Sequence, residues 1–502
     1  MIFIIKIGDI LTMRTCGILM PIFSLPSPYG IGTFGSAAYD FVDFLKKGAQ
    51  SLWQILPLNP TNYGDSPYQS FSSFAGNPYF IDLDMLAEEK LLLPTEIKAC
   101  DFGDNIEAVD YEKLYNHRLP LLKKAFNRFV INDEYNNFVT ENQFWLNDYA
   151  LFMAIKTANG GVSWQQWQEP LKKRDHAALK KAEAEYIDEI NFHKFLQFKF
   201  SEQWSALKNY ANKNGVKIIG DIPIYVALDS ADVWANTKQF LLDDDYIPKK
   251  VAGVPPDAFS ADGQLWGNPL YDWQYMNQTG YAWWKGYLGS ALKRYDLVRI
   301  DHFRGFESFF AIPYGDKNAT GGKWIKGPNT NLFNSLKKEF GKDLPIIAED
   351  LGVITPAVRK MLKATGFPGM KVLQFAFDGD SKNAYLPHNL TPHAVIYTGT
   401  HDNDTVMGWL KNSNESTVKN AKNYLNYTSD NGFNWAMIKA AMASVCDMCI
   451  LMMADLLGLD SSGRINTPST LGGNWQWRIK QECLNDWLAE ILKENTVIYG
   501  RI

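Results

Sequence analysis

Short apolar runs recur along the chain, and most of them end in loops rich in Gly, Pro, Ser or Asn. The first run, GILMPIF at 17–23, is followed by the loop SLPSPYGIGTFG and then by a segment, 37–48, with apolar residues at helical spacing. The run SLWQILP at 51–57 returns to a strand-like pattern. Strand, helix and strand in this order predict the start of a parallel β/α series.

Eight runs have the length and apolar content of buried strands. They lie near residues 17, 52, 218, 297, 346, 371, 395 and 449. Eight strands separated by helical segments predict an α/β fold, a (β/α)8 TIM barrel. The chain has 502 residues, about twice the ~250 typical of such a barrel, so large insertions between its strands are expected.

The strand pattern stops between 82 and 215, and a mainly helical insertion is predicted there. Three segments carry apolar residues at helical spacing: 111–130, 141–157 and 192–214. The segment 164–185 between them is rich in charged residues, which predicts an exposed position.

Two long loops, 58–79 and 251–271, are rich in Tyr, Gly, Pro and Asn, a content typical of functional loops. The second lies inside a predicted active-site insertion at 236–290. The rest of 13–502 is expected to be a single catalytic barrel. Residues 1–12 are predicted to be an N-terminal extension, upstream of an alternative start at Met13.

The net charge of −5 and a pI near 5.9, with no basic stripe, exclude nucleic acid as an expected partner. No apolar run reaches the ~18 residues of a membrane span, and the apolar patch at 2–5 is shorter than the ~7–15 residues of a signal-peptide core. Five scattered Cys suit a reducing compartment, so a cytoplasmic protein without membrane contact is predicted. Cys446 and Cys449 form a lone C-x-x-C in an apolar, helix-like run at 435–453. No second pair or nearby His supports a metal site.

Four predicted strands end in charged or polar clusters. These are Asp221; Arg299 with Asp301; Glu349; and His401 with Asp402. One such ending is explained equally well by a structural ion pair. Catalytic groups of a (β/α)8 barrel come from the carboxyl ends of several strands, so four endings together predict one active site.

Several carboxylates without a metal-ligand cluster, in a chain with 16 Trp and 24 Tyr, indicate glycoside chemistry. Arg299 shares a strand face with Asp301 and favours its ionised form, so Asp301 is the predicted nucleophile. Glu349 follows an apolar run with no adjacent cation, which favours a protonated acid/base. Alternation alone does not separate Glu349 from Asp350. Asp402 is expected to bind ring hydroxyls.

Ten segments carry a resemblance to a known family. They are SLPSPYGIGTFG, SLWQILPLNPT, YGDSPYQSFSSFAGNPYFIDL, IIGDIPIYV, FSADGQLWGNPLYDW, VRIDHFRGF, IIAEDLG, GFPGMKVLQFAF, YTGTHDNDT and INTPSTLGGNWQWR. In these the chain resembles the 4-α-glucanotransferases of the amylomaltase type, glycoside hydrolase family 77 in the α-amylase superfamily. The likeness runs from about 17 to 478. It implies a barrel with helical insertions. Because the recognisable pattern ends near the barrel, we do not expect the C-terminal β-domain that is common in α-amylases.

The resemblance also implies residue roles. Asp301 falls on the nucleophile, Glu349 on the acid/base and Asp402 on the transition-state stabiliser, with substrate contacts expected from Tyr68, Asp221, Trp266, Arg299, His302 and His401. No metal or organic cofactor is implied. The expected partners are α-1,4-glucans and maltooligosaccharides, with glucose as an acceptor, and the expected state is a monomer or a homodimer.

The expected reaction transfers a segment of an α-1,4-glucan to the 4-hydroxyl of an acceptor, by a retaining double displacement. An α-1,4-glucan hydrolase on the same barrel is an alternative, because the same carboxylates serve both outcomes and only the exclusion of water separates them. A non-catalytic maltodextrin-binding protein is a further alternative, which the three carboxylates disfavour.

Overall fold

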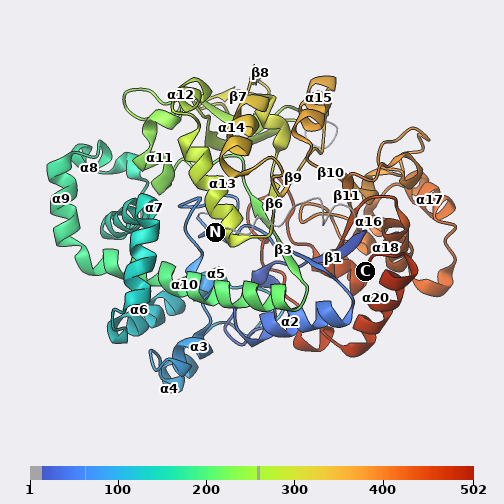
Figure 1. The fold of residues 1–502 in the computed structure, drawn as a ribbon, viewed down its shortest axis with the longest axis horizontal. Helices are drawn as coiled ribbons and strands as arrows, with labels where there is room; N and C mark the ends of the chain where they lie inside the picture. Colours follow the sequence, from blue (N-terminus) through green and yellow to red (C-terminus); the bar gives the residue numbers. More distant parts are fainter. Residues whose placement is uncertain (1–13, 63, 257–260) are drawn as a thin grey trace.

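Eight parallel strands close into a barrel at the centre of the molecule (Figure 1). The computed structural model describes residues 14–62, 64–256 and 261–502, so the predicted extension at 1–12 and the start at Met13 lie outside the described residues. The barrel strands are β1 (Thr15–Leu19), β2 (Leu52–Gln54), β3 (Lys217–Ile222), β6 (Leu297–Ile300), β9 (Ile346–Ala348), β10 (Gly369–Val372), β11 (Ala394–Tyr397) and β12 (Met448–Met452). All eight predicted strands are confirmed.

The barrel order is β1-β12-β11-β10-β9-β6-β3-β2. Its strands are almost entirely buried, as expected when side chains fill the inside and helices cover the outside. The pairing of β3 with β6 sets Asp221 opposite Arg299. Gly220 permits close packing there, because a Cβ at this position would lie 2.2 Å from the ring of Tyr295.

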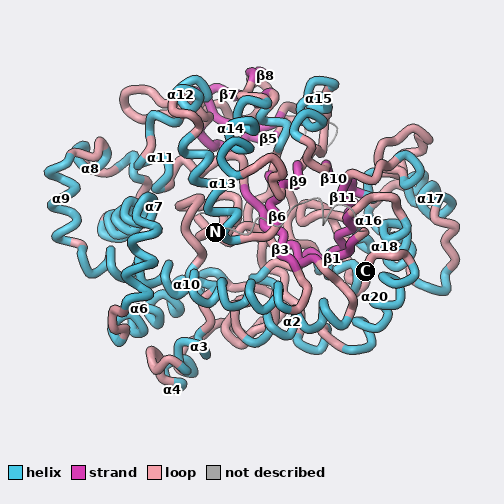
Figure 2. Tube along the Cα trace, in the orientation of Figure 1, coloured by secondary structure: helices cyan, strands magenta, loops and turns pink. Residues whose placement is uncertain are grey.

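Helices surround the barrel (Figure 2). They include α2 (Ser36–Lys47), α11 (Ala231–Ala235), α12 (Trp273–Gln278), α13 (Ala282–Arg294), α14 (Thr330–Phe340), α15 (Pro356–Thr365), α16 (Val406–Asn412), α17 (Glu415–Tyr424), α18 (Phe433–Ala443), α19 (Met453–Leu456) and α20 (Asp486–Ile498). The predicted helix at 37–48 is confirmed as α2. The apolar run at 435–453 is not one helix, because it divides into α18 and β12, and its two cysteines are free.

The segment 82–215 forms a helical lobe beside the barrel (Figure 1). It contains α3 (Leu83–Glu88), α4 (Pro94–Lys98), α5 (Tyr111–Lys113), α6 (Leu119–Arg128), α7 (Asp133–Ala158), α8 (Glu169–Lys172), α9 (His176–Glu185) and α10 (Ile187–Lys213). Helix α7 begins before the predicted 141, because the Asn132 side chain accepts from the N–H of Tyr135 and so starts the helix in a polar stretch. None of the described helices is long and apolar enough to cross a membrane.

The exposed position predicted for 164–185 is wrong at its start. Trp164 is fully buried, and its indole N–H donates to the carbonyl of Leu228 at 2.8 Å. Asp229 accepts from the backbone N–H of Trp164 and pairs with Lys156 at 2.5 Å. These contacts hold the helical lobe to the loop after β3, and charge content alone concealed them.

A small antiparallel sheet lies above the barrel, where the sequence predicted a loop at 251–271. Its order is β5-β4-β7-β8, from β5 (Gln264–Pro269), β4 (Lys250–Val254), β7 (Ser308–Pro313) and β8 (Lys323–Lys326). Residues 257–260 lie outside the described part. The Gly and Pro content of this segment resembles that of a loop. The second partner of β4 is β7, which lies far along the chain, so no local pattern indicated the sheet.

Candidate active site

A buried guanidinium joins two carboxylates at the end of β6. Arg299 lies 2.6 Å from Asp221 and 3.0 Å from Asp301, measured between its two terminal nitrogens and one oxygen of each carboxylate. The predicted pair of Arg299 with Asp301 is therefore confirmed, and Asp221 is a second partner. Burial acts to lower the pKa of Arg299, but the two carboxylates raise it well above its usual value. Arg299 thus stays charged and fixes the orientation of Asp301.

Glu349, which directly follows β9, lies in the opposite environment. It is 9% exposed, and its carboxylate oxygens accept the backbone N–H groups of His302 at 2.8 Å and Leu351 at 2.6 Å. Burial, followed by the charge of Asp301, raises the pKa of Glu349 to about 8. Glu349 therefore carries a proton at neutral pH, as a general acid must.

Glu349 and Asp350 accept hydrogen bonds from different backbone N–H groups, and this distinguishes them. One oxygen of Asp350 accepts the backbone N–H of Met370 at 2.7 Å, and the other lies 3.7 Å from the ammonium of Lys371. Asp350 thus joins β10, whereas Glu349 turns to the loop that carries Asp301. The alternation that the sequence left open is resolved in favour of Glu349 as the residue beside Asp301.

Tyr68, from the loop after β2, connects Asp221 to the far side of the barrel mouth. Its hydroxyl donates to Asp221 at 2.9 Å, and its ring stacks on that of His401 with centroids 5.1 Å apart. The ring of Trp475 lies 5.8 Å from Tyr68 and 5.9 Å from His401. These three rings form an aromatic wall between β2 and β11, of the kind on which sugars stack.

Asp402 is the most exposed of the three predicted catalytic carboxylates. Its side chain is 48% exposed and lies 3.5 Å from the ring nitrogen of His401. The side-chain amide of Asn466 donates to it at 2.6 Å, and Arg464 donates to its backbone carbonyl at 3.0 Å. The surface beside Asn466 is hollowed by a cavity of about 370 Å³. Asp402 therefore faces open space while two neighbours hold its position.

Trp266, on β5 of the small sheet, reaches the same mouth. Its ring meets that of His302 edge-on, with centroids 4.9 Å apart. His302 has a left-handed backbone, φ 48°, which presents its N–H to Glu349. Burial lowers the pKa of His302 to about 4, and its Nε2 atom is buried without a hydrogen-bond partner among the described residues. A neutral ring with a free nitrogen is ready to bind a sugar hydroxyl.

All nine predicted site residues are connected. Contacts join Trp266 to His302 and His302 to Glu349, and the charge of Asp301 acts on Glu349. From Asp301 the contacts continue through Arg299, Asp221, Tyr68 and His401 to Asp402.

Sequence reasoning missed three residues of this site: Arg464, Asn466 and Trp475. They lie in the loop that follows α19, which separates them from the last strand, β12, so no strand-end pattern marked them. The segment INTPSTLGGNWQWR contains two of them, and its Asn, Gly and Trp content was the available signal.

No group of three or more His, Cys, Asp or Glu side chains within 14–62, 64–256 and 261–502 is arranged to hold a metal ion.

Comparisons with known proteins point to one family. The family model described as 4-alpha-glucanotransferase, of glycoside hydrolase family 77, matches residues 20–484. The 4-alpha-glucanotransferase of Clostridium butyricum is 50% identical over 96% of this chain and all of that protein, and the one of Thermus thermophilus is 46% identical over 93% of this chain and 95% of its own length.

Solved structures show the same likeness. The amylomaltase of Streptococcus agalactiae, described in complex with acarbose, has a TM-score of 0.95 at 42% identity and covers 97% of this chain and 99% of its own. The amylomaltase of Corynebacterium glutamicum, at 19% identity and a TM-score of 0.76 over 98% of this chain and 75% of its own, shares the fold. The family match over most of the chain and the high identity to its members lead to one conclusion: the chain belongs to the 4-alpha-glucanotransferase family.

Proposed function

We propose that this 4-alpha-glucanotransferase moves segments of α-1,4-glucan between acceptors by a retaining double displacement, with Asp301 as nucleophile and Glu349 as acid/base. The observation that carries the proposal is the contrast between these two carboxylates. Asp301 is paired with Arg299 at 3.0 Å, whereas burial and Asp301 raise the pKa of Glu349 to about 8. One ionised and one protonated carboxyl are what glycosyl transfer with retention requires.

In the first step, Glu349 gives its proton to the glycosidic oxygen as the C1–O bond breaks. A carboxylate oxygen of Asp301 bonds to C1, and the reducing-end fragment leaves with a free 4-hydroxyl. In the second step, the 4-hydroxyl of the acceptor gives its proton to the Glu349 carboxylate and attacks C1. The bond to Asp301 breaks, and both residues return to their starting states.

Backbone contacts suit Glu349 to both steps. The N–H groups of His302 and Leu351 bind its two oxygens, so they stabilise the carboxylate that exists after the proton has left. Burial favours the protonated form. These opposed effects keep the group near the working pH range, where donation and acceptance of a proton are both accessible.

The remaining residues are proposed to bind the sugars. Asp402, held by Asn466 at 2.6 Å, accepts hydroxyls of the ring that develops positive charge. The free Nε2 of His302 and the ring of Trp266 face the sugar from the side of the small sheet. Tyr68 and His401 supply the aromatic wall opposite.

Transfer rather than hydrolysis is attributed to the cover of the site. Trp266 from the 236–290 segment and Tyr68 from the 58–79 loop lie at the mouth, where they reduce the access of water to the glycosyl intermediate. The proposed substrates are maltooligosaccharides and longer α-1,4-glucans, with glucose as an acceptor. The structure of the Streptococcus agalactiae amylomaltase is a complex with acarbose, an oligosaccharide, and this supports the proposed substrate class.

Incubation with maltotriose tests the proposal. A transferase forms glucose and longer oligomers with no net gain of reducing ends. A hydrolase gains one reducing end for each bond cleaved, and this result would replace transfer by hydrolysis. A binding protein would leave maltotriose unchanged, which would overturn the enzymatic assignment altogether.

A further inference from the structure

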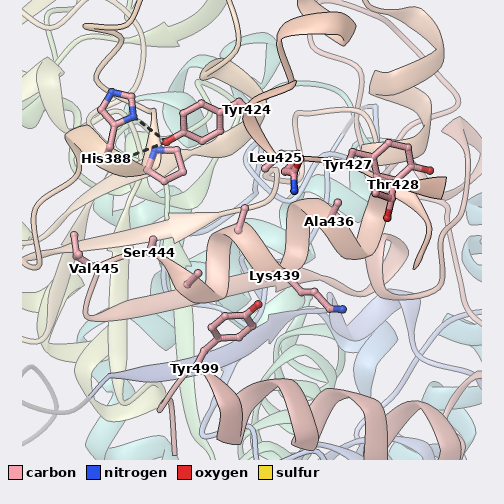
Figure 3. Close-up of a pocket in the computed structure, with 14 residues that line it drawn as sticks. His388, Tyr424, Leu425, Tyr427, Thr428, Ala436, Lys439, Ser444, Val445 and Tyr499 are labelled. Atoms are coloured by element: carbon pink, nitrogen blue, oxygen red, sulfur yellow. Dashed lines mark hydrogen bonds between the residues drawn. The ribbon is translucent and has the colours of Figure 1, made fainter. Parts of the chain in front are cut away.

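A hollow in the described structure lies far from the carboxylates, in the outer helical layer. It has a volume of about 570 Å³, within the range of small-ligand sites. Its lining comes from the end of α17, one face of α18 and the end of α20 (Figure 3). Ser444 precedes β12 and His388 precedes β11, so the hollow lies toward the amino ends of these strands. The catalytic residues follow the opposite ends.

Small residues of α18 form the floor of this hollow. Ala436, Ala440 and Ala443 occupy one helical face, at i, i+4 and i+7, and span about 10 Å at ~1.5 Å per residue. Their short side chains leave an elongated space beside the helix. In Figure 3 the lining extends from Val445 at one end to Tyr427 at the other.

Three tyrosines surround this floor: Tyr424, Tyr427 and Tyr499. The Tyr424 hydroxyl lies 2.9 Å from the ring nitrogen Nδ1 of His388, which fixes its ring. Tyr499 reaches the hollow from the α20 side, across from Tyr424 (Figure 3). The hydroxyls of Tyr427 and Tyr499 have no hydrogen-bond partner in the described part of the chain. Rings with free hydroxyls offer both the apolar face and the polar edge that a pyranose uses.

The charges of the lining favour a neutral ligand. No described lining residue is Asp or Glu. Both ring nitrogens of His388 are already engaged, by Tyr424 and by the carbonyl of Ser381 at 3.1 Å. Lys439 is therefore the one permanent charge, and a single ammonium beside three aromatic rings and several hydroxyls suits a sugar better than an anion.

We propose that this hollow is a second glucan-binding site, which holds a distant part of a long α-1,4-glucan while another part lies in the catalytic mouth. The proposal rests on the proposed function for its ligand. Two contacts on one polymer make the second binding event intramolecular, so the apparent affinity for long glucans rises while that for short ones does not.

Two variants test the site without touching the catalytic residues. Tyr499→Ala removes a ring that packs on no other aromatic ring among the described residues, and Ala440→Trp fills the floor. We expect each to raise the KM for amylose about three- to ten-fold, in line with the loss of one or two ring contacts, with kcat unchanged. The kinetics on maltotriose, which is too short to reach both sites, should stay at the wild-type level.

Trp487→Ala is the matched control, since Trp487 is a 68% exposed aromatic residue on the same helix that leads to Tyr499 but outside the hollow. Its kinetics on both substrates should be unchanged. Wild-type KM for amylose in both pocket variants would overturn the proposal, as would an equal rise in KM for maltotriose.

Direct binding separates this site from the catalytic function. In native gels that contain amylose, the Asp301→Asn protein should be retarded, and adding Tyr499→Ala should reduce that retardation. This readout needs no turnover, so it stands even if the proposed reaction fails. If inorganic phosphate binds in the hollow and amylose does not, the hollow is an anion site and the glucan proposal is wrong.

Discussion

The two sides of the barrel mouth treat their carboxylates in opposite ways. On the side of β3 and β6, Arg299 lies between Asp221 and Asp301 and contacts both. On the side of β9, Glu349 is more enclosed than Asp301, and it has only backbone N–H partners and no ion pair among the described residues. The contrast indicates how one barrel face can obtain a nucleophile and an acid from the same functional group, through an ion pair with Arg299 on one side and burial on the other.

The test with the largest expected effect removes the carboxylate charge of Asp301, the residue that Arg299 orients. Asp301→Asn keeps the shape and the position of the side chain but not the nucleophilic carboxylate. We expect turnover of maltotriose to fall by about 10⁴-fold or more, with the thermal unfolding profile preserved. Turnover above a trace in the purified variant would show that Asp301 is not the nucleophile.

The next test concerns Glu349, the carboxyl group without an ion pair among the described residues. Glu349→Gln removes the proton donor, and we expect a loss of about 10²- to 10⁴-fold with maltotriose. A glucosyl fluoride donor needs no protonation of its leaving group, so its first step should be largely retained in this variant. Asp350→Asn is the matched control, because Asp350 is the neighbouring buried carboxylate and contacts β10 instead. A similar loss in that variant would remove the special role of Glu349.

The sequence contained much of this contrast, but only where it is local. Arg299 and Asp301 are two residues apart on one strand, so their pairing was predictable. The contact between Asp221 and Arg299 depends on the register of β3 against β6, which no local pattern encodes. Glu349 and Asp350 were indistinguishable by alternation until the backbone donors of His302 and Met370 were placed.

The elements missed by sequence reasoning share one cause. The small sheet pairs β4 with β7 across more than fifty residues, and its glycines resemble a loop. Asn466 and Trp475 come from a loop some way after the last strand. Neither an alternation of apolar and polar residues nor a strand end indicated them. Partners distant in sequence decided each of these features, whereas the eight barrel strands carry their own apolar signature.

A smaller effect is expected at Asp402, the third carboxylate, which has neither the ion pair of Asp301 nor the burial of Glu349. Asn466→Ala removes the 2.6 Å hydrogen bond to the half-exposed Asp402 and leaves its charge in place. We expect kcat/KM to fall about ten-fold, the worth of one hydrogen bond to a charged group. In an Asp402→Asn background the same change should cost much less. Equal costs in both backgrounds would mean that Asn466 does not act through Asp402.

The smallest expected effect concerns stability, and its sign follows from the same contrast. Burial and Asp301 raise the pKa of Glu349 to about 8 in the folded protein, above the value of ~4.3 in an unfolded chain. The folded state therefore binds this proton more tightly, so the stabilisation is complete below the unfolded pKa and is lost as the pH rises through about 8. Glu349→Gln has no such proton to lose. We expect the variant to match the wild type near pH 4 and to have a free energy of unfolding about 1–3 kcal/mol higher at pH 9, measured by denaturant unfolding. A difference that is independent of pH would mean that Glu349 is not held protonated by its surroundings, and the assignment of acid and nucleophile from opposite environments would lose its basis.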